Sequence, residues 1–202
     1  MEDVVSFRLA DVYDIPVRDG YYDVVLAGMA LHHFSPLEEI LERINRFLRP
    51  DSYFVAQEFV GPSRFQWTDR QLQAANVLLQ LLPAKYRVRQ NSNELKEAVF
   101  SPSVLRMVLS DPSEAVESSR ILPLAARCLR VLEVRELGGS LLHPLLAGIA
   151  HNFVRGDEDS ARFLGLCIEA EDLLMKAAEI GSDFALIVCG KRTNHSVRTT
   201  AC

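Results

Sequence analysis

Apolar and polar positions in the first sixty residues follow two different periods, one typical of buried strands and one typical of a helix. Residues 23–28 form a short continuous apolar run, as expected for a strand buried on both faces of a parallel sheet. Apolar residues then recur at helical spacing from Leu37 to Leu48, and residues 52–60 form a second apolar run. Strand, helix and strand with short connections predict a βαβ unit.

Local sequence signals predict a further strand before residue 12 and the start of the helix near residue 35. Residues 4–12 mix β-branched, aromatic and polar residues, which predicts a strand that ends at Asp11. Ser35, followed by Pro36 at the first helical position and Glu38 two residues later, predicts the capped start of the helix.

From residue 61 to about residue 129 the pattern becomes helical. Thr68 with Gln71 predicts a capping box, and Ser-Pro at 101–102 and Asp-Pro at 111–112 predict two further helix starts. The remaining predicted elements are a strand at 129–137, helices at 141–154 and 158–180, a strand at 182–191 and a disordered tail at 193–202.

Composition narrows the class of protein. The 202 residues are 49% hydrophobic and 24% charged, which is typical of a folded domain with a substantial core. The formal net charge of −5 gives no indication of nucleic acid as a partner, and the longest apolar runs are too short to cross a membrane. Four cysteines without CxxC spacing, and acidic residues where a signal peptide would be basic, predict reduced thiols and a cytoplasmic location.

Three segments, in order, resemble class I S-adenosylmethionine-dependent methyltransferases. Residues 11–25 are similar to the family passage "DA-x-x-LP … DG-x-FD-x-V", with Asp-Gly at 19–20. Leu-His-His-Phe at 31–34 falls where the family has "LHH" after its fourth strand, and Leu-Arg-Pro-Asp-Ser at 48–52 is similar to the family's lead into its fifth strand. Phrases further along resemble one bacterial branch of small-molecule methyltransferases, at 58–62, 111–116 and 138–142.

This resemblance implies an α/β fold with a Rossmann-like methyltransferase sheet, which has the strand order 3-2-1-4-5-7-6 in the family. We expect that sheet to be incomplete, without its first two strands, because the family's Gly-rich first motif would lie several tens of residues before Asp11. We also expect helical cap insertions and an antiparallel C-terminal strand. The expected divisions of one domain over 1–192 are a cofactor-side core at 1–60, a helical cap at 61–128 and C-terminal strands with two inserted helices at 129–192.

The resemblance also implies positions that bind S-adenosylmethionine. The family's carboxylate that accepts a hydrogen bond from the adenine amino group falls at Asp11, and the accompanying backbone N–H falls at Val12. The backbone that lines the cofactor after the fourth strand falls at Gly28, where a small residue permits close approach. Without the expected upstream segment, we predict weak binding of the cofactor.

Histidines are the other candidates for the site. Adjacent helical positions point about 100° apart, so His32 and His33 are expected not to converge on one metal, and no metal site is predicted. His33, His143 and His151 are candidates for a substrate pocket, the last two because they lie two turns apart on one face of a predicted helix. Structural roles for all these rings are the competing interpretation.

The resulting functional hypothesis is methyl transfer to a small-molecule acceptor. This reaction depends on positioning and desolvation, so the sequence identifies no obligatory catalytic residue. The alternatives are a non-catalytic remnant that interacts with or regulates a partner, and one half of a split enzyme. The strand at 23–28 is expected to expose an unpaired apolar edge. Either residues 4–12 pair with that edge, or a second copy of the chain covers it and forms a homodimer.

Overall fold

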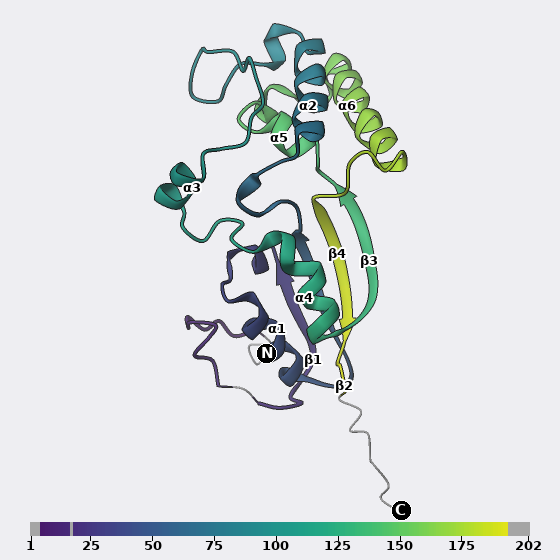
Figure 1. Ribbon diagram of the computed structural model, residues 1–202. Helices are drawn as coiled ribbons and strands as arrows, with labels where there is room; N and C mark the ends of the chain where they lie inside the picture. Colours follow the sequence, from purple (N-terminus) through teal and green to yellow (C-terminus); the bar gives the residue numbers. More distant parts are fainter. Residues whose placement is uncertain (1–4, 17, 194–202) are drawn as a thin grey trace, which may run out of the picture.

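A computed structural model describes residues 5–16 and 18–193 of the chain (Figure 1). The strands are β1 (Tyr22–Gly28), β2 (Leu48–Phe59), β3 (Arg130–Gly138) and β4 (Phe184–Gly190). The α-helices are α1 (Leu37–Phe47), α2 (Asp69–Leu81), α3 (Val104–Ser110), α4 (Ile121–Cys128), α5 (Leu142–Leu146) and α6 (Glu158–Lys176). Short 3-10 turns include η1 (Leu31–His33), η2 (Ser63–Phe65), η4 (Ser118–Arg120) and η5 (Ala150–Asn152).

The four strands form one mixed sheet in the order β1-β2-β4-β3. Strands β1 and β2 are parallel and α1 connects them, which confirms the predicted βαβ unit. Strand β4 is antiparallel to both β2 and β3, as expected for the C-terminal strand. This order equals the last four positions of the order that the family resemblance implies, so the expected α/β fold is confirmed.

Helices α1 and α4 pack on one face of the sheet (Figure 1). The apolar stripe predicted for α1 is buried there. It shares a core with side chains of β2, β4 and α4, namely Phe54, Ala56, Ile187, Ile121 and Leu124. Burying one large aliphatic side chain contributes about 1.5–3 kcal/mol, so this core accounts for much of the stability of the sheet layer.

A second apolar cluster lies beyond the carboxyl ends of β1 and β2, where α2, α5 and α6 gather (Figure 1). Its buried side chains include Ala75 and Leu79 from α2, Leu145 from α5 and Cys167 from α6. The capping box of Thr68 and Gln71 at the start of α2 is confirmed. Within the described ranges, no helix is long and apolar enough to cross a bilayer. Helix α4 falls in the range 61–128 but packs on the sheet instead of in this cluster.

The predicted strand at 4–12 is wrong over its described part. Residues 5–11 form neither helix nor strand, and the side chains of Phe7 and Leu9 are fully exposed. A strand needs hydrogen-bonding partners on a neighbouring strand, and none of the described strands lies beside this segment. The expectation that it pairs with β1 is therefore wrong as well. The alternative, a second copy of the chain at the β1 edge, stays a prediction.

Strand β1 is also less buried than its composition indicates. Among the described residues it pairs only with β2, and the side chains of Val24 and Leu26 are 49% and 74% exposed. The predicted burial on both faces is wrong, because an apolar run identifies a strand without identifying what covers its faces.

Two predicted helix starts differ from the structure. Ser35 makes no cap on α1, which begins after Pro36; its Oγ donates to Glu117 Oε1 at 2.7 Å instead. Asp111 ends α3 and starts no helix, because its carboxylate accepts hydrogen bonds from the backbone and side chain of Ser113. Both polar residues stabilise contacts of a loop rather than a helix end.

Smaller differences concern boundaries. The start predicted at 101–102 comes two residues early, since Ser103 precedes α3, and α6 ends at Lys176 rather than at residue 180. The helix predicted for 141–154 breaks after Leu146, and Gly148 adopts a φ of +74°. Residues 194–202 of the predicted tail lie outside the described residues. The three described cysteines are free and buried, as expected for reduced thiols.

Candidate functional site

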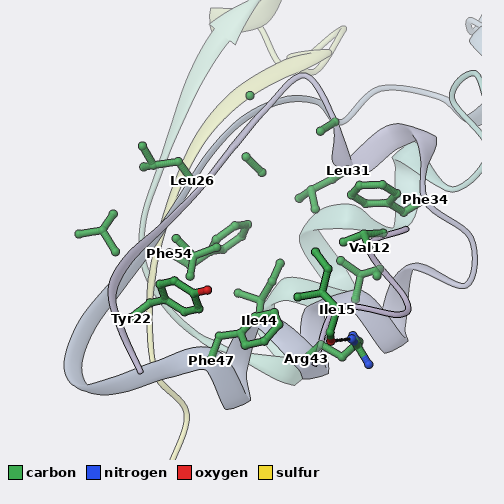
Figure 2. Close-up of a pocket in the computed structure, with 16 residues that line it drawn as sticks. Val12, Ile15, Tyr22, Leu26, Leu31, Phe34, Arg43, Ile44, Phe47 and Phe54 are labelled. Atoms are coloured by element: carbon green, nitrogen blue, oxygen red, sulfur yellow. Dashed lines mark hydrogen bonds between the residues drawn. The ribbon is translucent and has the colours of Figure 1, made fainter. Parts of the chain in front are cut away.

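A cavity of about 360 Å³ lies between β1 and α1 (Figure 2). Its walls are almost entirely apolar and come from β1, α1 and β2, including Tyr22, Leu26, Ile44, Phe47 and Phe54. The loop before β1 closes one side with the side chains of Val12 and Ile15. Arg43 of α1 donates a hydrogen bond to the carbonyl oxygen of Ile15 and so fastens this loop to the helix.

Two of the three residues predicted to bind the cofactor line this cavity, namely Val12 and Gly28. Apart from Gly28 and its two chain neighbours, no atom of the described residues lies within 4 Å of the position a Cβ would take at Gly28, so the backbone there is open to a ligand. Asp11 lies outside the cavity wall and is exposed, and its Oδ1 accepts a hydrogen bond from the backbone N–H of Tyr13 at 2.9 Å. The cavity is therefore apolar, and the carboxylate of Asp11 is not part of its wall.

A second cluster of polar groups lies at the carboxyl ends of β1 and β2. Glu58, near the end of β2, is fully buried. Its Oε1 accepts from the backbone N–H groups of Ala30 and Leu31 at 2.6 and 2.8 Å, and its Oε2 lies 2.8 Å from Nδ1 of His32. One carboxylate thus fixes the 3-10 turn η1 and the ring of His32. Ligands of open α/β sheets bind at this end of the strands.

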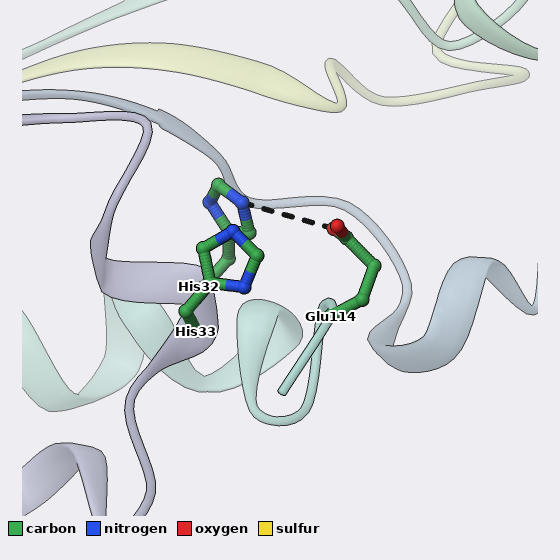
Figure 3. A group of neighbouring side chains, drawn as sticks. All are labelled: His32, His33 and Glu114. Carbon is green, nitrogen blue, oxygen red and sulfur yellow. Dashed lines mark ion pairs between the residues drawn. The ribbon is translucent and has the colours of Figure 1, made fainter. Parts of the chain in front are cut away.

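His33 contacts the loop that follows α3, whereas His32 contacts the strand β2. Nδ1 of His33 lies 3.1 Å from Oγ of Ser113, whose hydroxyl donates to Asp111 Oδ1 at 2.7 Å. Hydrogen bonds from Ser113, chiefly, hold the pKa of the Asp111 carboxyl below its ordinary value, and the nearby His33 adds to this. Oε1 of Glu114 lies 3.7 Å from Nε2 of His32 (Figure 3).

Hydrogen bonds attach the loop that carries Ser113 and Glu114 to the sheet. The backbone N–H of Val116 donates to the carbonyl oxygen of His32 at 3.1 Å. The guanidinium of Arg64 donates to the carbonyl oxygens of Glu114 and Pro112 at 3.0 and 2.7 Å. Side chains about eighty residues apart in the chain therefore meet at a defined place.

The expectation that His32 and His33 diverge is wrong. Their ring centroids lie 4.2 Å apart, and atoms of His32, His33 and Glu114 that can bind a metal all lie within 4.8 Å of one another. Sequence reasoning missed Glu58 and Glu114. A charged residue inside the apolar run 52–60 was the available signal for Glu58, because carboxylates are rarely buried without partners.

His143 and His151 do not share a helical face, and neither lines the cavity at Gly28. His151 is exposed on η5. The ring of His143 lies 5.2–5.8 Å, between centroids, from four aromatic rings, those of Phe59, Phe65, Trp67 and Phe184. Burial, and secondarily the charge of Lys96, lowers the pKa of His143. Its Nδ1 has no hydrogen-bond partner among the described residues, which fits a neutral ring in an apolar junction of cap and sheet.

Asp183 joins the same junction just before β4. Its backbone carbonyl accepts from the N–H groups of Val60 and Gly61, and its carboxylate accepts from Nε1 of Trp67 at 3.1 Å and from Nε2 of Gln71. Burial raises the pKa of the Asp183 carboxyl from 3.8 to about 6. The buried charge is thus unfavourable even with these donors.

This pKa predicts a pH dependence of stability. Between pH 4 and pH 6 the folded chain binds more protons at Asp183 than the unfolded chain, so stability falls as pH rises through that window. The difference between the two pKa values corresponds to about 3 kcal/mol. We expect the free energy of unfolding of Asp183→Asn, measured in urea, to gain about that amount relative to wild type between pH 4 and pH 7. A difference that stays constant with pH would contradict this.

Comparisons with known proteins match the N-terminal part of the chain to one family. Residues 1–56 match a family model described as a methyltransferase domain. The chain is 28% identical over 123 residues to the hybrid PKS-NRPS synthetase pydA of Acremonium sp, which covers 58% of this chain and 3% of that protein. It is 31% identical over 58 residues to the mitochondrial arginine-hydroxylase NDUFAF5 of Homo sapiens, which covers 29% of this chain and 17% of that protein. The chain therefore spans less than a fifth of the length of either relative.

Solved structures with a similar arrangement include geranyl diphosphate C-methyltransferase from Streptomyces coelicolor A3(2). It is 15% identical, with a TM-score of 0.45, and the match covers 92% of this chain and 52% of that chain. Phosphoethanolamine N-methyltransferase 2 of Haemonchus contortus is 13% identical, with a TM-score of 0.45, over 91% of this chain and 36% of that chain. The family match spans β1, η1, α1 and most of β2. The N-terminal part of this chain is a segment of a class I S-adenosylmethionine-dependent methyltransferase domain.

Proposed function

We propose that this chain takes part in the transfer of a methyl group from S-adenosylmethionine to a small-molecule acceptor. One observation carries the proposal: the segment that matches the methyltransferase family folds so that Val12 and Gly28, two positions the family would place beside the cofactor, line one cavity. When bound, the cofactor supplies an electrophilic methyl group on a sulfonium sulfur.

The residues of the chain would bind and orient the adenine part. The carboxylate of Asp11 would accept from the exocyclic amine, the backbone N–H of Val12 would donate to the ring, and the open backbone at Gly28 would admit close contact. The apolar walls would exclude water from the ring. The contribution of these residues to such a transfer would be to position the bound cofactor, and positioning supplies most of the rate.

The first test is binding of S-adenosylhomocysteine to residues 1–202, measured by saturation-transfer NMR, which detects weak ligands. We expect an affinity about 100-fold below that of a complete methyltransferase. A chain that contacts only the adenine lacks at least two charge-assisted hydrogen bonds that a complete enzyme makes to the rest of the ligand. Each contributes about 1.5 kcal/mol to binding. Asp11→Ala and Gly28→Leu should each abolish the signal from adenine protons.

The matched control is Asp14→Ala, which removes an exposed carboxylate three residues from Asp11. It should leave the adenine signal unchanged. Signals equal in wild type, Asp11→Ala and Gly28→Leu would contradict the proposed site. A complete lack of binding would favour the non-catalytic alternative, and binding restored by a second chain would favour the split enzyme.

A further inference from the structure

The histidine pair after β1 has an arrangement that methyl transfer does not require. Two imidazoles and one carboxylate, those of His32, His33 and Glu114, face one another where the loop after α3 meets η1 (Figure 3). Their metal-binding atoms all lie within 4.8 Å. Ligand atoms that share one zinc ion at about 2.0–2.1 Å lie about 3.3 Å apart, so modest side-chain rotation would bring all three atoms onto one ion.

The hydrogen bonds behind each ring fix which nitrogen is free. Glu58 accepts from the backbone with one oxygen and faces Nδ1 of His32 with the other, so this Nδ1 carries a proton, and in the neutral ring Nε2 keeps its lone pair. Oγ of Ser113 gives its proton to Asp111 and therefore accepts from Nδ1 of His33. In the neutral ring of His33, Nε2 likewise keeps its lone pair.

Carboxylates behind metal-bound histidines fix the tautomer and raise the basicity of the ligand nitrogen. Here Glu58 acts on His32 directly, and Asp111 acts on His33 through Ser113. A pair of histidines buried only for packing would not need a separate carboxylate behind each ring. Two arginines lie near the cluster. The guanidinium of Arg64 donates to backbone carbonyls of the loop and so positions Glu114, and Arg106 lines the cavity beside Glu114.

The cluster is also accessible. The side chain of Glu114 is 29% exposed, while that of His32 is only 5% exposed. A cavity of about 300 Å³ opens beside Glu114, with Phe65, Met107 and Asp111 among its lining residues. An ion could enter from this side, where Glu114 lines the cavity.

We propose that His32, His33 and Glu114 bind one divalent transition-metal cation of the zinc, iron(II) and cobalt(II) class. Two imidazoles and a carboxylate are ligands that such ions prefer, whereas magnesium and calcium prefer oxygen ligands alone. Three protein ligands leave at least one position for water or for an oxygen of a bound molecule. The proposal is independent of the methyl transfer proposed above, because it concerns metal binding by the chain alone.

The test is titration of the full chain, freed of any affinity tag and stripped with a chelator, with cobalt(II). We expect one cobalt ion per chain, seen as visible d–d absorption, and its displacement by one equivalent of zinc. His33→Asn and Glu114→Gln should each weaken binding at least about 100-fold. Glu58→Gln should weaken it about 10–100-fold, because the amide would donate to Nδ1 of His32 and move the proton to Nε2.

Three controls separate this site from others. His151→Asn removes an exposed histidine and should change nothing. Cys128→Ser and Glu42→Gln disrupt the other described group with metal-ligand spacing, which consists of Glu38, Glu42 and Cys128. Circular dichroism should show that each variant is folded.

The proposal would be overturned by a lack of stoichiometric cobalt absorption in the wild type. It would equally be overturned by binding that survives both His33→Asn and Glu114→Gln in folded protein, or by binding that only Cys128→Ser abolishes. None of these results depends on S-adenosylhomocysteine binding, so the failure of this proposal and of the proposed function can be told apart.

Discussion

Glu58→Ala is expected to lower the free energy of unfolding by about 3–5 kcal/mol. The carboxylate is fully buried and accepts from Ala30 N, Leu31 N and Nδ1 of His32. Its removal leaves three donors without partners where water has little access. The turn η1 should then detach from the sheet. Urea unfolding gives the stability change, and amide hydrogen exchange at Ala30 and Leu31 reports the local opening.

Two controls make this result specific to the carboxylate. Gln57→Ala alters the exposed neighbour on β2 and should change stability by about 0.5 kcal/mol or less. Glu58→Gln keeps an acceptor for Ala30 and Leu31 and should cost about 1–2 kcal/mol. Equal losses for Glu58→Ala and Gln57→Ala would mean that the three hydrogen bonds contribute little to the fold.

Gly139→Ala is expected to destabilise the chain by about 3 kcal/mol or more. Gly139 lies between β3 and α5 with a φ of +86°, and a Cβ there would lie 2.3 Å from Cδ2 of Phe184. The substitution therefore combines a left-handed backbone with a collision against a ring packed between Phe59 and His143. The loss should be visible as a lower midpoint in thermal or urea unfolding.

Gly148→Ala is the matched control for the backbone part of this effect. Gly148 has a similar φ of +74°, but apart from its chain neighbours no atom of the described part of the chain lies within 4 Å of the position that a Cβ would take there. Gly148→Ala should lower the free energy of unfolding by about 1 kcal/mol. Trimming the ring with Phe184→Leu should recover part of the loss in the Gly139→Ala background, as a double-mutant cycle can measure. Equal costs at both glycines would contradict the role assigned to the Phe184 ring.

Local signals predicted much of the secondary structure, and their failures have a common cause. The capping box at Thr68 formed as expected, because Gln71 lies within the same helical turn. Ser35 and Asp111 carry similar signals but bind Glu117 and Ser113 instead. A polar residue before a helix can hydrogen-bond either to the first turn of that helix or to a residue distant in the sequence. The local sequence does not show which distant residues will lie nearby.

The candidate site shows the same division. Val12 and Gly28 could be selected from the sequence because they belong to a motif whose spacing is local, and both line the cavity beside β1. Glu114 could not, since it reaches His32 only when the loop after α3 docks on η1 through Val116 and Arg64. His143 and His151 were grouped by a helical period that Gly148 interrupts.

The sequence by itself determined which segments are strands and helices in the βαβ unit, since apolar periods and short connections leave few alternatives. It also determined the methyltransferase resemblance of the N-terminal part. Only the tertiary structure decided that the segment before β1 pairs with none of the described strands, that β1 is an edge strand among them, and that Glu58, Ser113 and Glu114 surround two histidines. Those outcomes depend on contacts between residues distant in the chain, whose formation is governed by packing and hydrogen bonding of the whole fold rather than by any local pattern.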